Sequence, residues 1–159
     1  MADDDGRNET KAERLDRNWN DMLQELRVVQ TGVQLLSGFL LTLPFTERFR
    51  DLDVWQERLY LALVLTAALA VGATLTPIMV HRRLFGQQVK ERVVGAGHMF
   101  LQVVMGLLAL IIVGISTLIF SVVLQWEAAL VVTVVSGAVL VLLLLVVPLL
   151  IGRRTRVPS

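Results

Sequence analysis

Four long stretches of this chain contain no aspartate, glutamate, lysine or arginine. They cover residues 28–46, 59–81, 93–126 and 128–152, which is 19, 23, 34 and 25 residues. A helix of about 20 mainly apolar residues crosses a hydrocarbon core about 30 Å thick, so each stretch is long enough to span a membrane. Burying four such helices in a soluble core would need far more amphipathic chain than 159 residues provide. The sequence therefore predicts an all-α, polytopic membrane protein, with four transmembrane helices in a bundle.

The charged segments on either side of the apolar stretches predict the domain organisation. Residues 1–13 are acidic and polar, which predicts a disordered N-terminus. Residues 14–152 are expected to form the transmembrane domain, with spans at about 27–45, 59–80, 98–124 and 128–151, and residues 153–159 to form a basic tail. Because the first apolar run begins only at Val28, we expect no cleaved signal peptide.

The segment ahead of the first span predicts an amphipathic N-terminal helix. Its apolar residues recur on one helical stripe: Leu15, Trp19, Met22, Leu23, Leu26 and Val33. This helix either lies along the membrane surface or runs straight into the first span. A second stripe, from Phe45 to Leu59, predicts a short interfacial helix between the first two spans.

The basic residues predict the orientation. With four spans, both termini share one side of the membrane, and that side carries twelve of the 15 basic residues. The positive-inside rule then places both termini in the cytoplasm, at the plasma membrane. The opposite side has three basic and five acidic residues, a net charge of −2. Aromatic rings favour the membrane–water boundary, and Trp55, Tyr60 and Trp126 fall at that boundary on the outer side.

Two pairs of polar residues interrupt the apolar spans. Gln30 and Gln34 are one helical turn apart in the first span, and His98 and Gln102 are one turn apart in the third. At 1.5 Å per residue, Gln34 lies about 10 Å beyond Arg27, and His98 lies about 9 Å beyond Arg92. The four side chains are therefore predicted to meet as a polar intramembrane cluster. This cluster is either a structural hydrogen-bond network or a polar pathway in which His98 titrates.

Other features of the spans and loops predict contacts with lipid or with other helices. Four cations in the loop after the second span are candidate contacts for anionic lipid headgroups, or they only set the topology: Arg82, Arg83, Lys90 and Arg92. A stripe of small residues in the second span predicts a close helix–helix contact: Ala62, Thr66, Ala70 and Thr74. The fourth span is aliphatic all round, so it faces either lipid or a second copy of the chain.

Several segments resemble a known membrane protein family. The residues are Trp19–Asp21, Gln24–Gln34, Leu41–Phe45, Arg48, Phe49, Gln56, Tyr60, His81, Arg82, Leu84 and Phe85. Over roughly residues 18–124, the chain resembles an actinobacterial family of four-helix integral membrane proteins, a domain of unknown function. Some members of that family carry a sodium:proton antiporter label. The resemblance implies a four-helix membrane fold and makes antiport a candidate activity.

The residue inventory argues against catalysis. The chain has no cysteine, no histidine–carboxylate cluster at ligand spacing and no glycine-rich phosphate loop, so we expect no enzyme activity, metal or cofactor. It also lacks the basic, aromatic-rich groove of a nucleic-acid binder. No aspartate or glutamate lies inside a span, although cation antiport generally needs one. We therefore expect a structural or accessory membrane subunit in a homo-oligomer or larger complex. The alternative is a small oligomeric cation or proton transporter.

Overall fold

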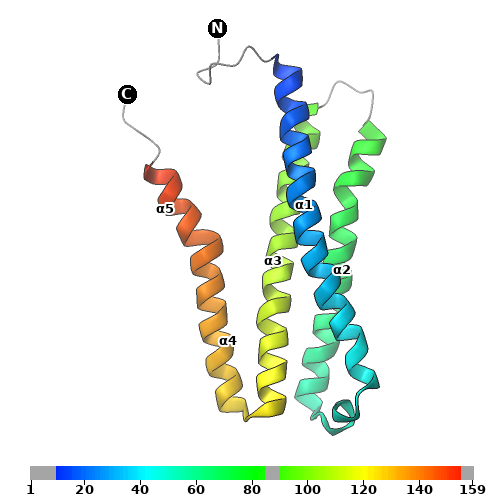
Figure 1. The fold of residues 1–159 in the computed structure, drawn as a ribbon, viewed down its shortest axis with the longest axis vertical. Helices are drawn as coiled ribbons and strands as arrows, with labels where there is room; N and C mark the ends of the chain where they lie inside the picture. Colours follow the sequence, from blue (N-terminus) through cyan, green and yellow to red (C-terminus); the bar gives the residue numbers. More distant parts are fainter. Residues whose placement is uncertain (1–9, 85–89, 155–159) are drawn as a thin grey trace. The chain divides into compact units, whose positions relative to one another are not determined.

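The computed structural model describes residues 10–84 and 90–154, and all the regular structure in those residues is helical. The long helices are α1 (Lys11–Thr42), α2 (Val54–Leu84), α3 (Lys90–Val123) and α4 (Trp126–Val141), the last continuing through η3 (Leu142–Val146) into α5 (Val147–Arg154) (Figure 1). Four helical segments are long and apolar enough to span a membrane: Glu13–Phe45, Val54–Val80, Gly97–Val123 and Trp126–Ile151. The predicted all-α fold with four membrane-spanning helices is confirmed.

Helix α1 runs without a break from the N-terminal segment through the first span, which decides between the two placements left open by the sequence. It begins at Lys11, inside the segment for which disorder was expected up to residue 13; residues 1–9 lie outside the described part of the chain. Thr10 and Glu13 explain this start. The Thr10 main-chain N–H donates to the Glu13 carboxylate at 2.8 Å, and the Glu13 N–H donates to Thr10 Oγ1 at 3.3 Å. Such a capping box satisfies amides that a helix start leaves unpaired.

The connection between α1 and α2 consists of two short 3₁₀ turns, η1 (Leu43–Phe45) and η2 (Glu47–Asp51), and not of the predicted interfacial helix. Pro44 lacks the amide hydrogen that a continuing α-helix would use. Thr46 then adopts an extended backbone, with φ −92° and ψ 149°, which separates the two turns. The connection is held down by Phe49, whose ring meets that of Tyr60 edge-on with 4.9 Å between centroids.

The residue contacts divide the chain into two compact units, and α1, α2 and α3 each contribute to both. The first unit comprises Met1–Ser37 and Ala67–Leu108, and the second comprises Gly38–Thr66 and Ala109–Ser159. The buried positions of α2 are spaced three or four residues apart, and those of α1 four or seven apart, as in helices packed along a common seam.

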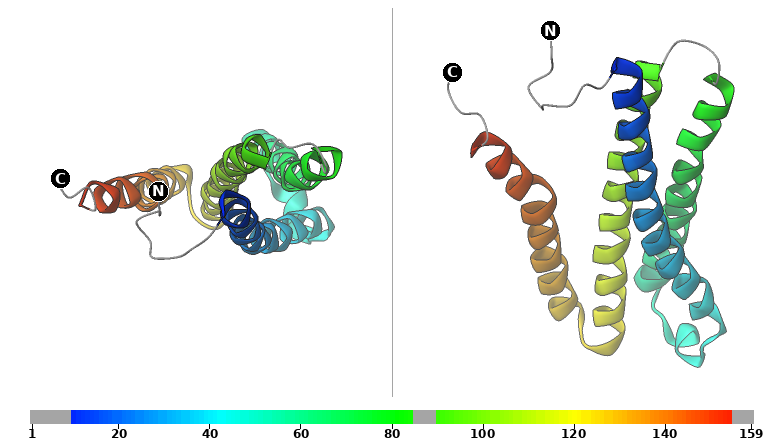
Figure 2. Two further views of the ribbon diagram at one scale, coloured as in Figure 1. Left: turned by 90° about the horizontal axis from the view of Figure 1, so that it is seen from above. Right: turned by 45° about the horizontal axis from the view of Figure 1, so that its top comes forward.

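In the first unit, α1 packs along α3. Met22, Leu26 and Leu101 form its buried core, with Trp19 and Val29 against them. Gly97 lies against the side chains of Met22 and Trp19, and a Cβ built on Gly32 would lie 3.7 Å from Leu108. The two helices run in the same direction and side by side in both views (Figure 2). Their register is therefore defined: residues near 22 and 26 of α1 lie level with residues near 97 and 101 of α3.

In the second unit, α2 packs against the end of α1 and against α3. The Tyr60 hydroxyl donates to the Leu40 main-chain carbonyl at 3.2 Å, and both residues are buried. Leu63 rests directly on Gly114, whose missing side chain makes room for it. Glycine thus permits the close approach of α2 and α3 at this level.

The small-residue stripe of α2 coincides only partly with its buried face. Ala70 and Thr74 are buried as expected, but Ala62 is exposed. The buried positions are instead Gln56, Tyr60, Leu63, Ala67, Ala70, Thr74 and Pro77. An exact four-residue repeat drifts around a helix with 3.6 residues per turn, so it leaves the seam, whereas alternating steps of three and four follow it.

The fourth span is largely exposed within the second unit. Ala129 is its one buried residue in α4, and none of its most apolar window is buried. Thr133 of α4 and Thr117 of α3 share a hydrogen bond of 2.6 Å between their hydroxyls. Farther along, η3 is a π-helical turn in which the Val147 N–H donates to the Leu142 carbonyl. Pro148 follows directly, and its missing N–H breaks the regular bonding pattern there.

Candidate functional site

The start of α2 is organised by a reciprocal pair of residues, Asp53 and Gln56. Asp53 Oδ1 accepts the main-chain N–H groups of Trp55 at 2.7 Å and Gln56 at 2.9 Å. In return, Gln56 Oε1 accepts the main-chain N–H of Asp53 at 2.9 Å. This is a capping box with aspartate at the N-cap and glutamine three residues later. It fixes both side chains at the helix end.

Gln56 also joins α2 to α3. Its side chain is 7% exposed, and its Nε2 donates to the Ser121 carbonyl at 3.0 Å and lies 3.4 Å from Ser121 Oγ. The amide is therefore satisfied at both ends, by the capping box and by α3. A buried amide without these partners would be costly, so the α2–α3 contact depends on this geometry.

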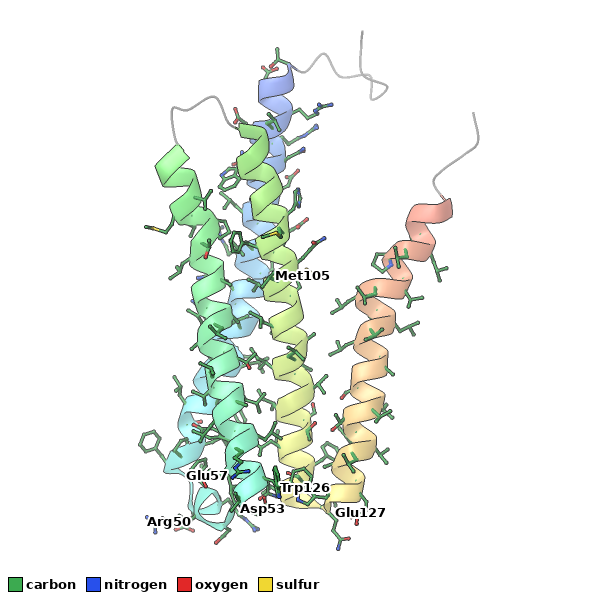
Figure 3. All side chains as sticks on the ribbon, turned by 180° about the vertical axis from the view of Figure 1, so that it is seen from behind. Arg50, Asp53, Glu57, Met105, Trp126 and Glu127 are labelled. Atoms are coloured by element: carbon green, nitrogen blue, oxygen red, sulfur yellow. The ribbon has the colours of Figure 1, made fainter. Side chains whose placement is uncertain are left out.

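Asp53 reaches the start of α4 as well. The Trp126 indole N–H donates to Asp53 Oδ2 at 3.2 Å, and the two residues lie next to each other where α2 and α4 begin (Figure 3). The main-chain N–H of Gln56 lowers the pKa of the Asp53 carboxyl the most, and the Trp126 indole and the Trp55 N–H lower it further. Hydrogen bonds to an ionised carboxylate favour the charged form, so Asp53 is a fixed negative charge at neutral pH.

Beside this cluster lies a shallow, open groove of about 600 Å³, lined by Trp55, Arg58, Leu59 and Trp126. We call it the indole groove. The Arg58 guanidinium carbon lies 5.2 Å from the centroid of the Trp55 ring, within the range of a cation–π interaction. The groove therefore combines two indole rings, one leucine and one cation, at the beginning of two membrane-spanning segments.

The polar pairs predicted from the sequence lie in the first unit, but the α1–α3 register separates them along the helix axis. Since Gly97 lies against Met22, His98 is level with the Met22 region and not with Gln34, twelve residues farther along α1. Twelve residues correspond to about 18 Å. Counting residues from Arg27 and Arg92 along the sequence places Gln34 and His98 at similar depths. The α1–α3 register does not support this placement, because Arg27 and Arg92 themselves lie at different levels along the helices.

Gln30 and Gln102 are closer in level, since Leu101 packs beside Leu26. Gln30 is partly buried, while Gln34, His98 and Gln102 are exposed on the flanks of their helices. All four are described residues, and the structure gives no hydrogen bond between any two of them. The four residues stay candidates for interactions with groups outside the chain, and a network among themselves stays a prediction.

The four candidate lipid-binding cations flank residues 85–89. Arg82 and Arg83 belong to the last turn of α2, and Lys90 and Arg92 to the first turn of α3. Their side chains lie outside the described part of the structure. Contact with anionic headgroups therefore stays a prediction.

Sequence reasoning missed the role of Asp53, Gln56 and Ser121, although one signal was available. The order Asp53-Val54-Trp55-Gln56, two residues before the apolar run that begins at Leu59, matches the capping-box pattern of a helix start. The contacts with Ser121 and Trp126, 65 and 73 residues away along the chain, leave no such local signal. Among the described residues, no three histidine, cysteine or acidic side chains are grouped so that they could hold a metal ion.

Comparison with known proteins gives one match. The profile of a family of unknown function, DUF6328, matches residues 8–148. No curated protein and no solved structure matches the chain. The match covers the first three membrane-spanning segments completely and the fourth, Trp126–Ile151, as far as Pro148.

Proposed function

Given that the chain belongs to the DUF6328 family of unknown function, we propose that it is a non-catalytic membrane protein, a structural or accessory subunit of a homo-oligomer or larger membrane complex. The proposal rests on Gln34. This residue lies eleven residues before Phe45, where the first span ends, so it is about 16 Å inside the membrane, near the middle of a core about 30 Å thick. Its side chain is nonetheless exposed on the single chain.

Lipid cannot satisfy an amide at that depth. An unpaired amide in hydrocarbon is costly, and glutamine side chains in membranes commonly hydrogen-bond across helices. Within the chain, α1 has its buried seam on Met22, Leu26, Val33 and Leu40, and Gln34 lies beside that seam and not in it. A helix of another subunit, or of a second copy, would supply the missing partner.

The fourth span supports the same proposal. Its aliphatic residues are exposed over most of its length, whereas Ala129 is buried and Thr133 bonds to Thr117 of α3. Lipid tails can cover this helix, and a neighbouring subunit can cover it as well. The span thus leaves ample surface for assembly.

Single-cysteine cross-linking tests the proposal directly, because the natural chain has no cysteine. We expect Gln34→Cys, in native membranes, to form a cross-linked product by oxidation or with a short bifunctional reagent. Leu35→Cys is the matched control, since Leu35 is 75% exposed, lies at the same depth and points about 100° away around the helix. Equal cross-linking of both variants, or of neither, would contradict an interface at Gln34.

A small oligomeric cation or proton transporter is the second candidate. This function is favoured by the exposure of His98 and Gln102. Because both side chains lie on the outside of the single chain, they could line a pathway only if that pathway ran between subunits. His98 is the one ionisable group among the four candidate residues. We expect a transporter to show proton flux in reconstituted vesicles that is lost in His98→Ala, and an accessory subunit to show no flux in the natural protein.

We propose a plasma-membrane location with both termini in the cytoplasm. The support is the surplus of basic residues on the side of the termini and the confirmed number of four spans. Reporter fusions after Arg17, at Gly86 and after Arg156 should be active as cytoplasmic fusions. Fusions near Asp53 and Glu127 should report the opposite side.

A further inference from the structure

One carboxylate, that of Asp53, contacts both tryptophans of the indole groove. Asp53 Oδ2 accepts the indole N–H of Trp126, and Asp53 Oδ1 accepts the main-chain N–H of Trp55. Trp55 is further held by the Arg58 guanidinium over its ring. Asp53 thus positions the Trp126 indole and the backbone of Trp55, and Arg58 restrains the Trp55 ring, so the groove is partly preorganised.

The groove lies where protein meets the membrane boundary. Trp55, Arg58 and Leu59 belong to the first six residues of the span Val54–Val80, and Trp126 is the first residue of the span Trp126–Ile151. Indole rings and arginine stems suit this level, since both combine an apolar body with a polar end. Whatever occupies the groove must also have an apolar part beside Leu59 and a polar part beside Arg58.

Arg58 brings a cation to a face that is acidic overall. Among the described residues the structure gives Arg58 no ion pair, so its charge is available to a ligand. The Trp55 indole N–H also has no hydrogen-bond partner among those residues. A phosphate oxygen is the acceptor that arginine favours, and a guanidinium can bind two of its oxygens at once.

We propose that the indole groove binds the phosphodiester of a membrane phospholipid, with the phosphate on Arg58 and the start of an acyl chain along Leu59. The net charge of −2 on this side of the chain, with Glu57 and Glu127 beside the groove residues in sequence, disfavours a headgroup with net negative charge. A zwitterionic headgroup, which adds an ammonium to the phosphate, is therefore the preferred ligand.

Tryptophan fluorescence can test this proposal in the full-length chain. In a Trp19→Phe background the two groove indoles are the only tryptophans, since the chain has three. The purified protein in detergent is titrated with phosphatidylethanolamine whose acyl chain carries bromine, a quencher of indole fluorescence. We expect Arg58→Gln to raise the half-quenching lipid fraction about fivefold, which corresponds to one lost cation–headgroup interaction.

Arg50→Gln is the matched control, because it removes the same charge from η2, on the same side of the chain but outside the groove (Figure 3). It should leave the half-quenching fraction unchanged, and Arg58→Lys should restore part of the affinity. Equal shifts in Arg58→Gln and Arg50→Gln, with unchanged thermal unfolding, would overturn a site at Arg58. Stronger quenching by brominated phosphatidylglycerol than by phosphatidylethanolamine would overturn the zwitterionic preference.

Competition with inorganic phosphate distinguishes a site for a phospholipid headgroup from a site for free phosphate. For a lipid site, excess inorganic phosphate should leave the titration with brominated lipid unchanged, because the acyl chain contributes to binding. If inorganic phosphate displaces the lipid and restores the indole fluorescence, the groove is a site for free phosphate and the lipid proposal fails.

Discussion

Asp53 and Gln56 each accept a main-chain N–H from the other, both at 2.9 Å, across the first turn of α2. The same two side chains carry the links from α2 to Ser121 of α3 and to Trp126 of α4. One helix cap therefore also sets the positions of two neighbouring helices. Substitutions at this cap are expected to change local helix stability and the α2–α3–α4 contacts together.

Asp53→Ala should lower the thermal stability of the protein in detergent by a few degrees, since it removes the N-cap acceptor for two main-chain N–H groups and for the Trp126 indole. Asp53→Asn should lose less, because asparagine is also a good N-cap residue. Asp51→Ala, two residues earlier in η2, is the control. If Asp51→Ala and Asp53→Ala lower the thermal stability equally, the loss in Asp53→Ala does not come from the helix cap.

The contribution of Asp53 to stability should depend on pH. Its pKa in the folded protein lies below the ordinary value of 3.8. A lowered folded-state pKa means that the stabilisation is complete above the ordinary value and is lost as the pH falls through the folded-state value. We expect the difference in unfolding midpoint between the natural protein and Asp53→Asn to be constant near neutral pH and to shrink in strong acid. A difference that grows in acid would contradict this assignment.

Gln56→Ala should cost about 1–3 kcal/mol of unfolding free energy, because it leaves the main-chain carbonyl of the buried Ser121 and the main-chain N–H of Asp53 without their partner. Ser121→Ala should cost under about 1 kcal/mol, since the shorter bond from Gln56 goes to the Ser121 carbonyl, which alanine keeps. Denaturant titration of both variants, followed by indole fluorescence, measures the difference. A larger loss in Ser121→Ala would show that the hydroxyl is the main acceptor.

Gly114→Ala should destabilise the protein by about 1–3 kcal/mol, because the new Cβ would overlap Leu63. Gly106→Ala is the control on the same helix: a Cβ there meets nothing within 4 Å, so it should be neutral or should stabilise by up to about 1 kcal/mol. Combining Gly114→Ala with Leu63→Ala should reduce the cost of the glycine substitution. No reduction in the double variant would rule out a clash with Leu63.

The hydrogen bond between Thr117 and Thr133 should contribute modestly to holding α4. Each hydroxyl also lies 2.8 Å from a carbonyl of its own helix, Thr117 from Val113 and Thr133 from Ala129. Because a hydroxyl has one proton, one of the two threonines donates to its own helix and the other donates across to its partner. A double-mutant cycle with Thr117→Val and Thr133→Val should give a coupling of about 0.6 kcal/mol, as membrane interhelical hydrogen bonds do on average. A coupling near zero would mean that the α3–α4 contact rests on Ala129 packing.

The sequence by itself determined the helical class and the number of spans. These properties are local: a run of apolar residues long enough to cross a membrane must satisfy its backbone hydrogen bonds within the run, and a helix does so. The helix starts at Thr10 and Asp53 are also readable locally, since each capping box lies within four consecutive residues.

The register between helices was decided only by the tertiary structure. Whether His98 lies level with Gln34 or with Met22 depends on which side chain of α1 meets Gly97, and side chains of similar apolarity occur every three or four residues along both helices. The buried apolar surface is nearly the same in each of these registers. The close packing of Met22 on Gly97 and of Leu63 on Gly114, in contrast, is possible in only one register. For the same reason the meeting of Asp53 with Trp126 follows from how α2, α3 and α4 pack, and from no pattern within either segment.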